Sequence, residues 1–332
     1  MSTPGSALPP ASSSGVPAGP MTFGQILDRV YHLLRANLKL FLGISAVPGV
    51  ACLVCYALMF AGVFFVVKPW HRQAPPTFTP MAGLMLAASG LVCVVMMVMS
   101  ALYEPAACYA ALQANAGSKA TTREAWGVAL AKAGRYLWLA ILRALVVAAP
   151  LIAVAVAVAV VTIHTMQQSH GQVSPDRAML IVPIMMLVEA VWLVYFTFVM
   201  IRLAVAYPAS LAENLTAWPS LVRSNRLTKG GRGRIFLVAL LLYAITYAAA
   251  IVLEMAVMIL AGLGMLVGFI LHLTLVPWAY VGGGVLGVIL LITFFLYTAC
   301  TWSAFEISFA VFYHDQRLRN EGVPPAACER PA

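Results

Sequence analysis

Six long apolar runs constrain the fold of this chain more than any other feature of its sequence. A helix needs about 20 apolar residues to cross the hydrocarbon of a bilayer, and each run reaches that length. They lie at roughly 40–67, 81–103, 137–163, 179–206, 235–270 and 279–312. Only 9% of the residues are charged, whereas soluble domains carry roughly 25%. The sequence therefore predicts an all-α fold, a polytopic membrane bundle of about six transmembrane helices. The least distinct boundary is that between the fifth and sixth spans, near Pro277 and Trp278.

Basic residues are distributed unequally among the connections between these runs. Fifteen Lys and Arg residues lie on one side of the predicted bundle and three on the other. Short connections rich in Lys and Arg stay in the cytoplasm. We therefore expect a multi-pass protein of the cell inner (plasma) membrane with both termini cytoplasmic. The net charge of +9 is explained by this asymmetry, and we expect no nucleic acid partner.

Composition divides the chain into three parts. Residues 1–21 are rich in Pro, Ser, Gly and Ala and are predicted to be disordered. They lack the basic and apolar parts of a cleavable signal peptide, so the first span is expected to serve as an uncleaved anchor. Residues 22–318 form the predicted transmembrane domain, and residues 319–332 a flexible C-terminal tail.

A short amphipathic segment precedes each odd-numbered span. The three segments begin at similar signals, at Thr22, Thr121 and Thr216, and the first two signals are capping boxes. Their expected ends are 97 and 96 residues apart, at Asn37, Gly134 and Gly230. We interpret the pattern as three related units, each a cytoplasmic interfacial helix followed by a transmembrane hairpin. Similar hairpin lengths arising by coincidence are the alternative.

Motifs of membrane-embedded catalysis are missing from the sequence. There is no H-E-x-x-H pair for zinc, no Gly-rich phosphate loop and no G-x-S-x-G elbow. The histidines predicted on the outer side come from three different connections, at His71, His164, His170 and His272. We therefore expect no catalytic residue, no metal and no cofactor.

Charged residues inside the spans are costly in lipid, so each is a candidate for a functional or structural role. Arg143, Arg202 and Glu306 lie near the predicted cytoplasmic boundary. Either arginine is expected to pair with Glu306 or to extend toward lipid phosphates. Glu189 and Glu254 lie deeper. They fit either a proton or cation path or hydrogen-bonded packing positions.

The fourth connection, residues 207–234, is the most distinctive stretch. It places five basic residues in one short loop. Such a loop serves as an orientation signal that contacts headgroups, or as a docking surface for an anionic lipid or an acidic partner. Arg223 and Arg226 are expected to contact anionic groups, and Glu213 is expected to pair with a neighbouring base. The candidates for ion pairing or for binding anionic groups are Arg143, Arg202, Glu213, Arg223, Arg226, Glu306 and Arg317.

Three segments together resemble a known family. They are Phe23–Arg29 with the Phe41–Ile44 stretch after it, Glu213–Gly230, and Phe312–Gly322. They are similar to a large bacterial family related to the membrane domain found on some glycerophosphoryl diester phosphodiesterases. The resemblance covers about residues 22–323 and implies a six-span protein. Asn225 stands where the family usually has Trp, and His314 and Gln316 also depart from its pattern.

The resemblance does not bring an enzyme activity with it. In the fused proteins, the phosphodiesterase belongs to a separate soluble domain, and the motif residues of that domain are not found here. We therefore expect a non-catalytic integral membrane protein that contacts membrane lipids, or a protein partner, through a basic cytoplasmic face. The alternatives are a transporter of small solutes or ions and a membrane-embedded lipid-modifying enzyme.

Overall fold

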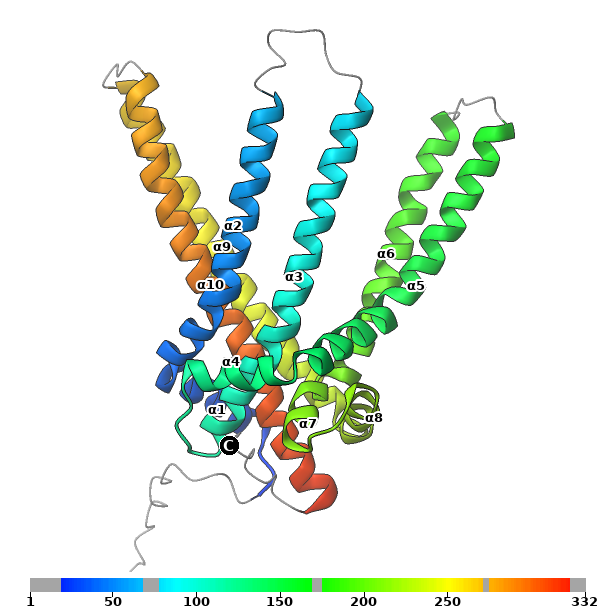
Figure 1. The fold of residues 1–332 in the computed structure, drawn as a ribbon, viewed down its shortest axis with the longest axis vertical. Helices are drawn as coiled ribbons and strands as arrows, with labels where there is room; N and C mark the ends of the chain where they lie inside the picture. The colour runs from blue at the N-terminus through cyan, green and yellow to red at the C-terminus, as the bar shows by residue number, and fades with distance from the viewer. Residues whose placement is uncertain (1–18, 68–77, 169–174, 271–274, 323–332) are drawn as a thin grey trace, which may run out of the picture.

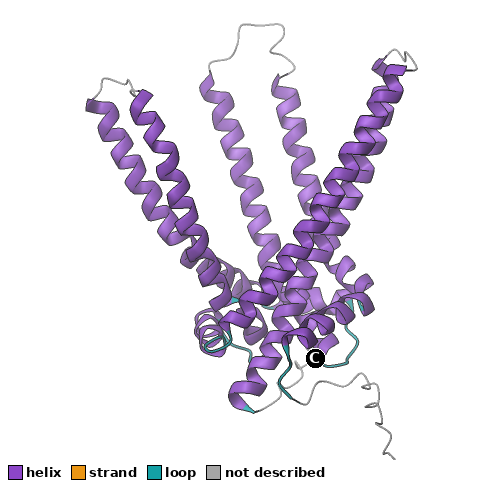
Figure 2. Cartoon of the chain, turned by 180° about the vertical axis from the view of Figure 1, so that it is seen from behind, coloured by secondary structure: helices purple, strands orange, loops and turns teal. Residues whose placement is uncertain are grey.

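The computed structural model describes residues 19–67, 78–168, 175–270 and 275–322, which are helical almost throughout (Figures 1 and 2). The helices are α1 (Phe23–Ala36), α2 (Leu38–Val67), α3 (Phe78–Asn115), α4 (Thr122–Ala131), α5 (Ala133–Gln168), α6 (Pro175–Leu203), α7 (Ala206–Ala212), α8 (Ala217–Leu227), α9 (Arg232–Ile270) and α10 (Leu275–Glu321). No strand occurs in these ranges. The predicted all-α class is confirmed.

Six of the helices form three hairpins that diverge from one end of the molecule (Figure 1). The pairs are α2 with α3, α5 with α6, and α9 with α10, and all six are long and apolar enough to cross a membrane. Large apolar side chains point outward along them: Val94, Val191 and Val252 are 54%, 63% and 68% exposed. Exposing this much apolar surface to water would be strongly unfavourable, so the hairpins are surrounded by lipid. The chain is a multi-pass membrane protein.

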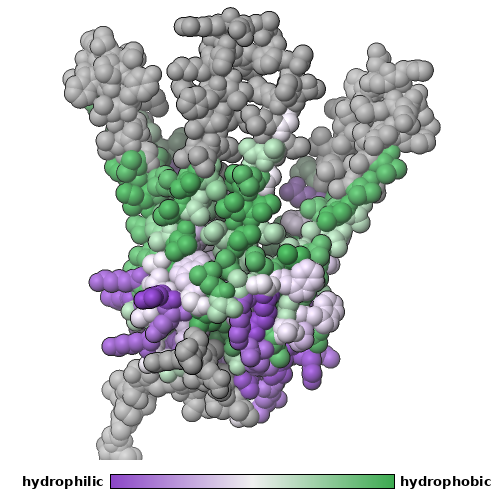
Figure 3. Space-filling model, in the orientation of Figure 1, coloured by the Kyte–Doolittle hydropathy of each residue, from purple (hydrophilic) through white to green (hydrophobic). Residues whose placement is uncertain are grey.

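The hairpins meet in a layer that we call the base. It consists of α1, α4, α7 and α8, the first turns of α5 and α9, and the last turns of α3 and α10. The buried core lies here, where Ala106 and Ala110 of α3 pack with Ile307 and Val311 of α10. Hydrophilic residues gather on its surface, while the hairpins above it are hydrophobic (Figure 3). The base therefore holds the three hairpins together.

The three-unit organisation predicted from the sequence agrees with the order of the helices. Each hairpin follows a short helix: α1, α4 or α8. Thr22 and Thr121 form complete capping boxes at α1 and α4, and Thr216 is the N-cap of α8 without a side-chain hydrogen bond. A capping box satisfies two backbone N–H groups that have no partner within the helix, which fixes where these helices begin.

One asparagine near the end of each unit contacts the short helix of the same unit or the residues that follow it. Asn115 accepts a hydrogen bond from Arg29 of α1 at 3.1 Å. Asn214 accepts from Lys132 and Arg135, which follow α4, at 2.7 and 2.8 Å. Asn320 donates to the Leu227 carbonyl at the end of α8, at 3.1 Å. These hydrogen bonds join the end of each unit to its beginning.

Two local predictions about helix ends are wrong. α4 ends at Ala131, and Gly134 lies inside α5, because a one-residue kink at Lys132 separates the two helices. The fourth span does not continue to 206 as one helix: α6 ends at Leu203, and the short helix α7 follows. The hydroxyl of Ser224 donates to the carbonyl of Arg202 at 2.9 Å, which gives this carbonyl a partner at the break.

The predicted boundaries of the terminal segments also need correction. α10 continues to Glu321, beyond the predicted start of the tail at 319. Its last three residues are held by contacts with other segments: Arg319 donates to Met21, Asn320 donates to Leu227, and Glu321 pairs with Arg223. Met21 belongs to the segment predicted to be disordered, but only 3% of it is exposed. Its backbone N–H donates to Asp315, and its carbonyl accepts from Arg319. Residues 1–18 and 323–332 lie outside the described ranges.

A glycine permits close packing where α9 begins. A Cβ on Gly231 would lie 2.6 Å from Nε2 of Gln316, whose side chain is 2% exposed. Nothing lies within 4 Å of the corresponding position on Gly233, two residues later. The approach of α9 to α10 therefore depends on Gly231.

We expect Gly231→Ala to lower the free energy of unfolding by roughly 1–3 kcal/mol, because the buried Gln316 amide has no room to withdraw. Gly233→Ala is the matched control and should be neutral or stabilising by up to about 1 kcal/mol. Thermal unfolding of the purified proteins in one detergent compares them. Equal melting temperatures for the two variants would contradict the packing described here.

Candidate functional site

A network of ion pairs joins α7, α8 and α10 in the base. Arg223 of α8 donates to Glu213, the C-cap of α7, at 2.9 Å, and to Glu321 of α10 at 2.5 Å. Arg317 donates to Glu321 at 3.1 Å, and the Tyr313 hydroxyl donates to Glu213 at 2.9 Å. The predicted pairing of Glu213 with a neighbouring base is confirmed.

The chain turns sharply to build this network. Asn214, directly after Glu213, has φ of +53°, a left-handed conformation that asparagine tolerates. The turn brings α8 back against α7, so that Arg223 faces Glu213. Burial lowers the pKa of Arg223, but its hydrogen bonds to Glu213 and Glu321 outweigh burial and raise it above the usual value. Arg223 is therefore charged, it holds α7 and α10 against α8, and its charge is balanced by Glu213 and Glu321.

Asp315 fastens the start of the described chain to the end of α10. It is fully buried and accepts from the Met21 amide at 2.7 Å. Its other oxygen pairs with Arg319 at 2.9 Å and Arg234 at 3.3 Å. Both arginines also donate to the Met21 carbonyl, at 2.7 and 2.6 Å. The two ends of the described chain therefore lie on the same side of the hairpins.

A third group of polar side chains lies at the end of α6. Arg202 and Arg232 both donate to Oδ1 of Asn225, at 3.0 and 2.9 Å. The two guanidinium groups also lie 5.0 and 5.9 Å from the centre of the Phe198 ring. Asn225 is thus the acceptor that holds the two cations together.

One charged residue from each hairpin meets at the junction of the three hairpins. Arg143 of α5 donates to Glu104 of α3 at 2.5 Å. Glu306 of α10, which is 5% exposed, lies within electrostatic range of both. The expected pairing of Arg143 or Arg202 with Glu306 is wrong: Arg143 pairs with Glu104, and Arg202 binds Asn225. Sequence analysis missed Glu104 because it lies just beyond the predicted second span.

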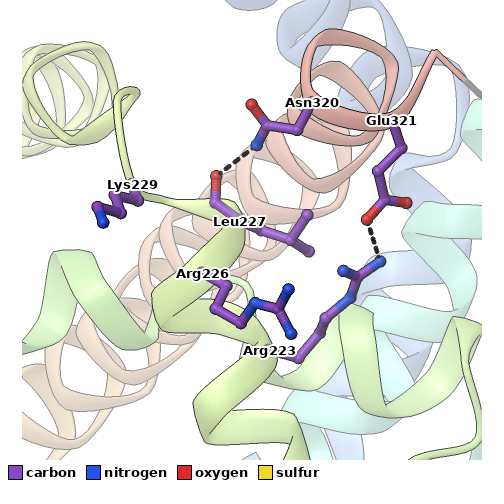
Figure 4. A pocket seen from close by; sticks show the side chains of 6 residues that line it. All are labelled: Arg223, Arg226, Leu227, Lys229, Asn320 and Glu321. Carbon is purple, nitrogen blue, oxygen red and sulfur yellow. Dashed lines mark hydrogen bonds and ion pairs between the residues drawn. The ribbon is translucent and has the colours of Figure 1, made fainter.

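A pocket of about 320 Å³ opens between the end of α8 and the end of α10 (Figure 4). It is lined by Arg223, Arg226, Leu227, Lys229, Asn320 and Glu321. Figure 4 shows Glu321 directed at Arg223, with Arg226 beside Arg223 and Lys229 farther away. Arg226 and Lys229 are exposed, and neither forms an ion pair with any residue in the described ranges. The pocket therefore presents two cations whose charge is not balanced.

The exposed side of α8 combines apolar and basic residues. Trp218 and Val222 are 62% and 45% exposed, and Arg226 follows them one turn farther on the same side. Trp is typical of the boundary between hydrocarbon and water. This side of α8 has the chemistry of a surface that contacts a membrane interface.

The deep acidic residues lie apart from these clusters. Glu189 on α6 and Glu254 on α9 are both exposed on the hairpins, which disfavours the packing alternative. No group of three His, Cys, Asp or Glu side chains within the described ranges is placed to hold a metal ion. Of the histidines considered above, His71, His170 and His272 lie outside these ranges.

Comparisons of the chain with protein-family models, with curated proteins and with solved structures find no match. The resemblance to the phosphodiesterase-associated membrane family stays a prediction.

Asp315→Asn should destabilise the protein by roughly 1.5–3 kcal/mol, the contribution of a hydrogen bond to a charged group. Asn keeps an acceptor for Met21 but loses the charge that faces Arg234 and Arg319. Asp28→Asn is the control, because that side chain is 71% exposed beside His32 and should change stability by less than about 0.5 kcal/mol. Thermal unfolding distinguishes the two. Equal effects would show that Asp315 is not the anchor.

Proposed function

We propose that this protein is a non-catalytic protein of the cell inner membrane that binds anionic, phosphate-bearing lipid headgroups through its base. The observation that supports this is the pocket between α8 and α10, with Arg226 and Lys229 at its edge. Neither cation is neutralised by a described residue, whereas the neighbouring Arg223 is held by two carboxylates.

The five arginines among the predicted candidates fall into two classes. Arg143, Arg202, Arg223 and Arg317 contact acceptors within the protein, and their role is structural. Arg226 is the predicted candidate that remains available to a ligand, and Lys229 joins it. A basic residue near an anionic membrane surface contributes about 1 kcal/mol to binding. Two such residues lining one pocket favour an anionic over a neutral headgroup.

The side of the membrane follows from the distribution of charge. The base carries most of the Lys and Arg residues of the chain, and basic connections favour the cytoplasm. The contact between Met21 and Arg319 requires an even number of crossings between the two ends. We therefore place the base, and both ends of the chain, in the cytoplasm, where anionic headgroups of the inner leaflet lie beside Trp218 and Val222.

Native mass spectrometry of the purified protein tests this function. We expect phosphatidylglycerol to bind about 30-fold more weakly to the double variant Arg226→Ala, Lys229→Ala, the equivalent of roughly 2 kcal/mol for two cations. Phosphatidylcholine binding should not change. The matched control is Lys119→Ala, Arg123→Ala, which removes the same charge from two exposed residues, one just before α4 and one in its first turn, that do not line the pocket.

The outcomes separate the possibilities. Equal loss in the two double variants would mean that net charge, not the pocket, attracts the lipid, and no loss in either would end the proposal. Competition by glycerol 3-phosphate at similar concentration would indicate a site for a soluble phosphate ester instead of a lipid.

A further inference from the structure

The charges at the junction of the hairpins do not balance. Glu104, Arg143 and Glu306 come from α3, α5 and α10, one from each hairpin. Arg143 is committed to Glu104: its Nη1 bonds to that carboxylate at 2.5 Å, and its Nη2 faces the sulfur of Met200 at 3.8 Å. Glu306 makes no hydrogen bond or ion pair with any residue that the structure describes, although its side chain is buried. With both carboxylates ionised, the junction would carry a net negative charge.

Among the residues that the structure describes, none offers Glu306 another cation. The titratable and charged groups that face it are Glu104 and Tyr103 of α3, Arg143 of α5 and Tyr207 of α7. The Tyr103 hydroxyl is already bonded to Ser45 and Ser303. A buried carboxylate without a partner is strongly disfavoured, and such groups take up a proton instead.

We propose that the junction is a proton-binding site, in which Glu306 carries an exchangeable proton at neutral pH beside the Glu104–Arg143 ion pair. The proton is taken from water and returned to it, so no other reactant is needed. Its release leaves a second negative charge facing Glu104 across the boundary between α3 and α10. Because these helices join two hairpins, protonation of Glu306 stabilises their contact. This inference does not depend on the lipid-binding proposal.

Infrared spectroscopy of the full-length protein in lipid distinguishes a protonated carboxyl from a carboxylate. In Glu306→Gln, we expect one protonated-carboxyl band to disappear, with carboxylate absorbance unchanged. Glu124→Gln is the matched control, because Glu124 is exposed on α4 and the new amide can still form the capping box. That variant should lose carboxylate absorbance and no protonated band.

Glu104→Gln provides an independent second variant. It frees Arg143 to pair with Glu306, so Glu306 should ionise: the protonated band disappears while carboxylate absorbance stays constant, one carboxylate replacing another. Loss of carboxylate absorbance without loss of a protonated band in Glu306→Gln would overturn the proposal. It would show that Glu306 is ionised in the native protein.

Discussion

Charged and polar groups without partners are costly in hydrocarbon, and this cost shapes the architecture. The three hairpins present mainly apolar side chains, which in lipid have little reason to associate. The polar chemistry is therefore concentrated in the base, where Asp315, Glu213 and Glu321 link segments that are far apart in the sequence. Most of these links include α10. It packs against α1, α2, α3, α7, α8 and α9, and it carries four charged residues in addition to Glu306.

The sequence predicts the six spans and the three-unit pattern because both follow from local rules, namely span length, helix caps and periodicity. Thr22 and Thr121 act as the caps that their spacing indicates. The pairing of charges was predicted less well, because a partner depends on tertiary contacts that sequence distance does not reveal. Glu104 lies 39 residues from Arg143, and Asp315 lies 294 residues from Met21. The break after Leu203 was also missed, since it depends on Ser224 of another helix.

The structure changes how the basic fourth connection is understood. Its arginines looked equivalent in the sequence, but Arg223 and Arg232 serve to hold helices together, whereas Arg226 and Lys229 stay available. One connection thus combines assembly of the base with a surface suited to phosphate. The junction at Glu306 lies elsewhere and belongs to the contact between hairpins. Headgroup binding and protonation are therefore separable properties of the same fold.

The central claim is that one basic layer, on the cytoplasmic side, gathers all three hairpins. Labelling of single cysteines with a membrane-impermeant maleimide, in a chain without its native cysteines, tests it most directly. Cysteines at Lys119 and Lys229, from two different connections of the base, should react only in inverted vesicles, and one at Gln168, the far end of α5, only in intact cells. Reaction of the first two from opposite sides would contradict the architecture, and reaction of both in intact cells would contradict its orientation.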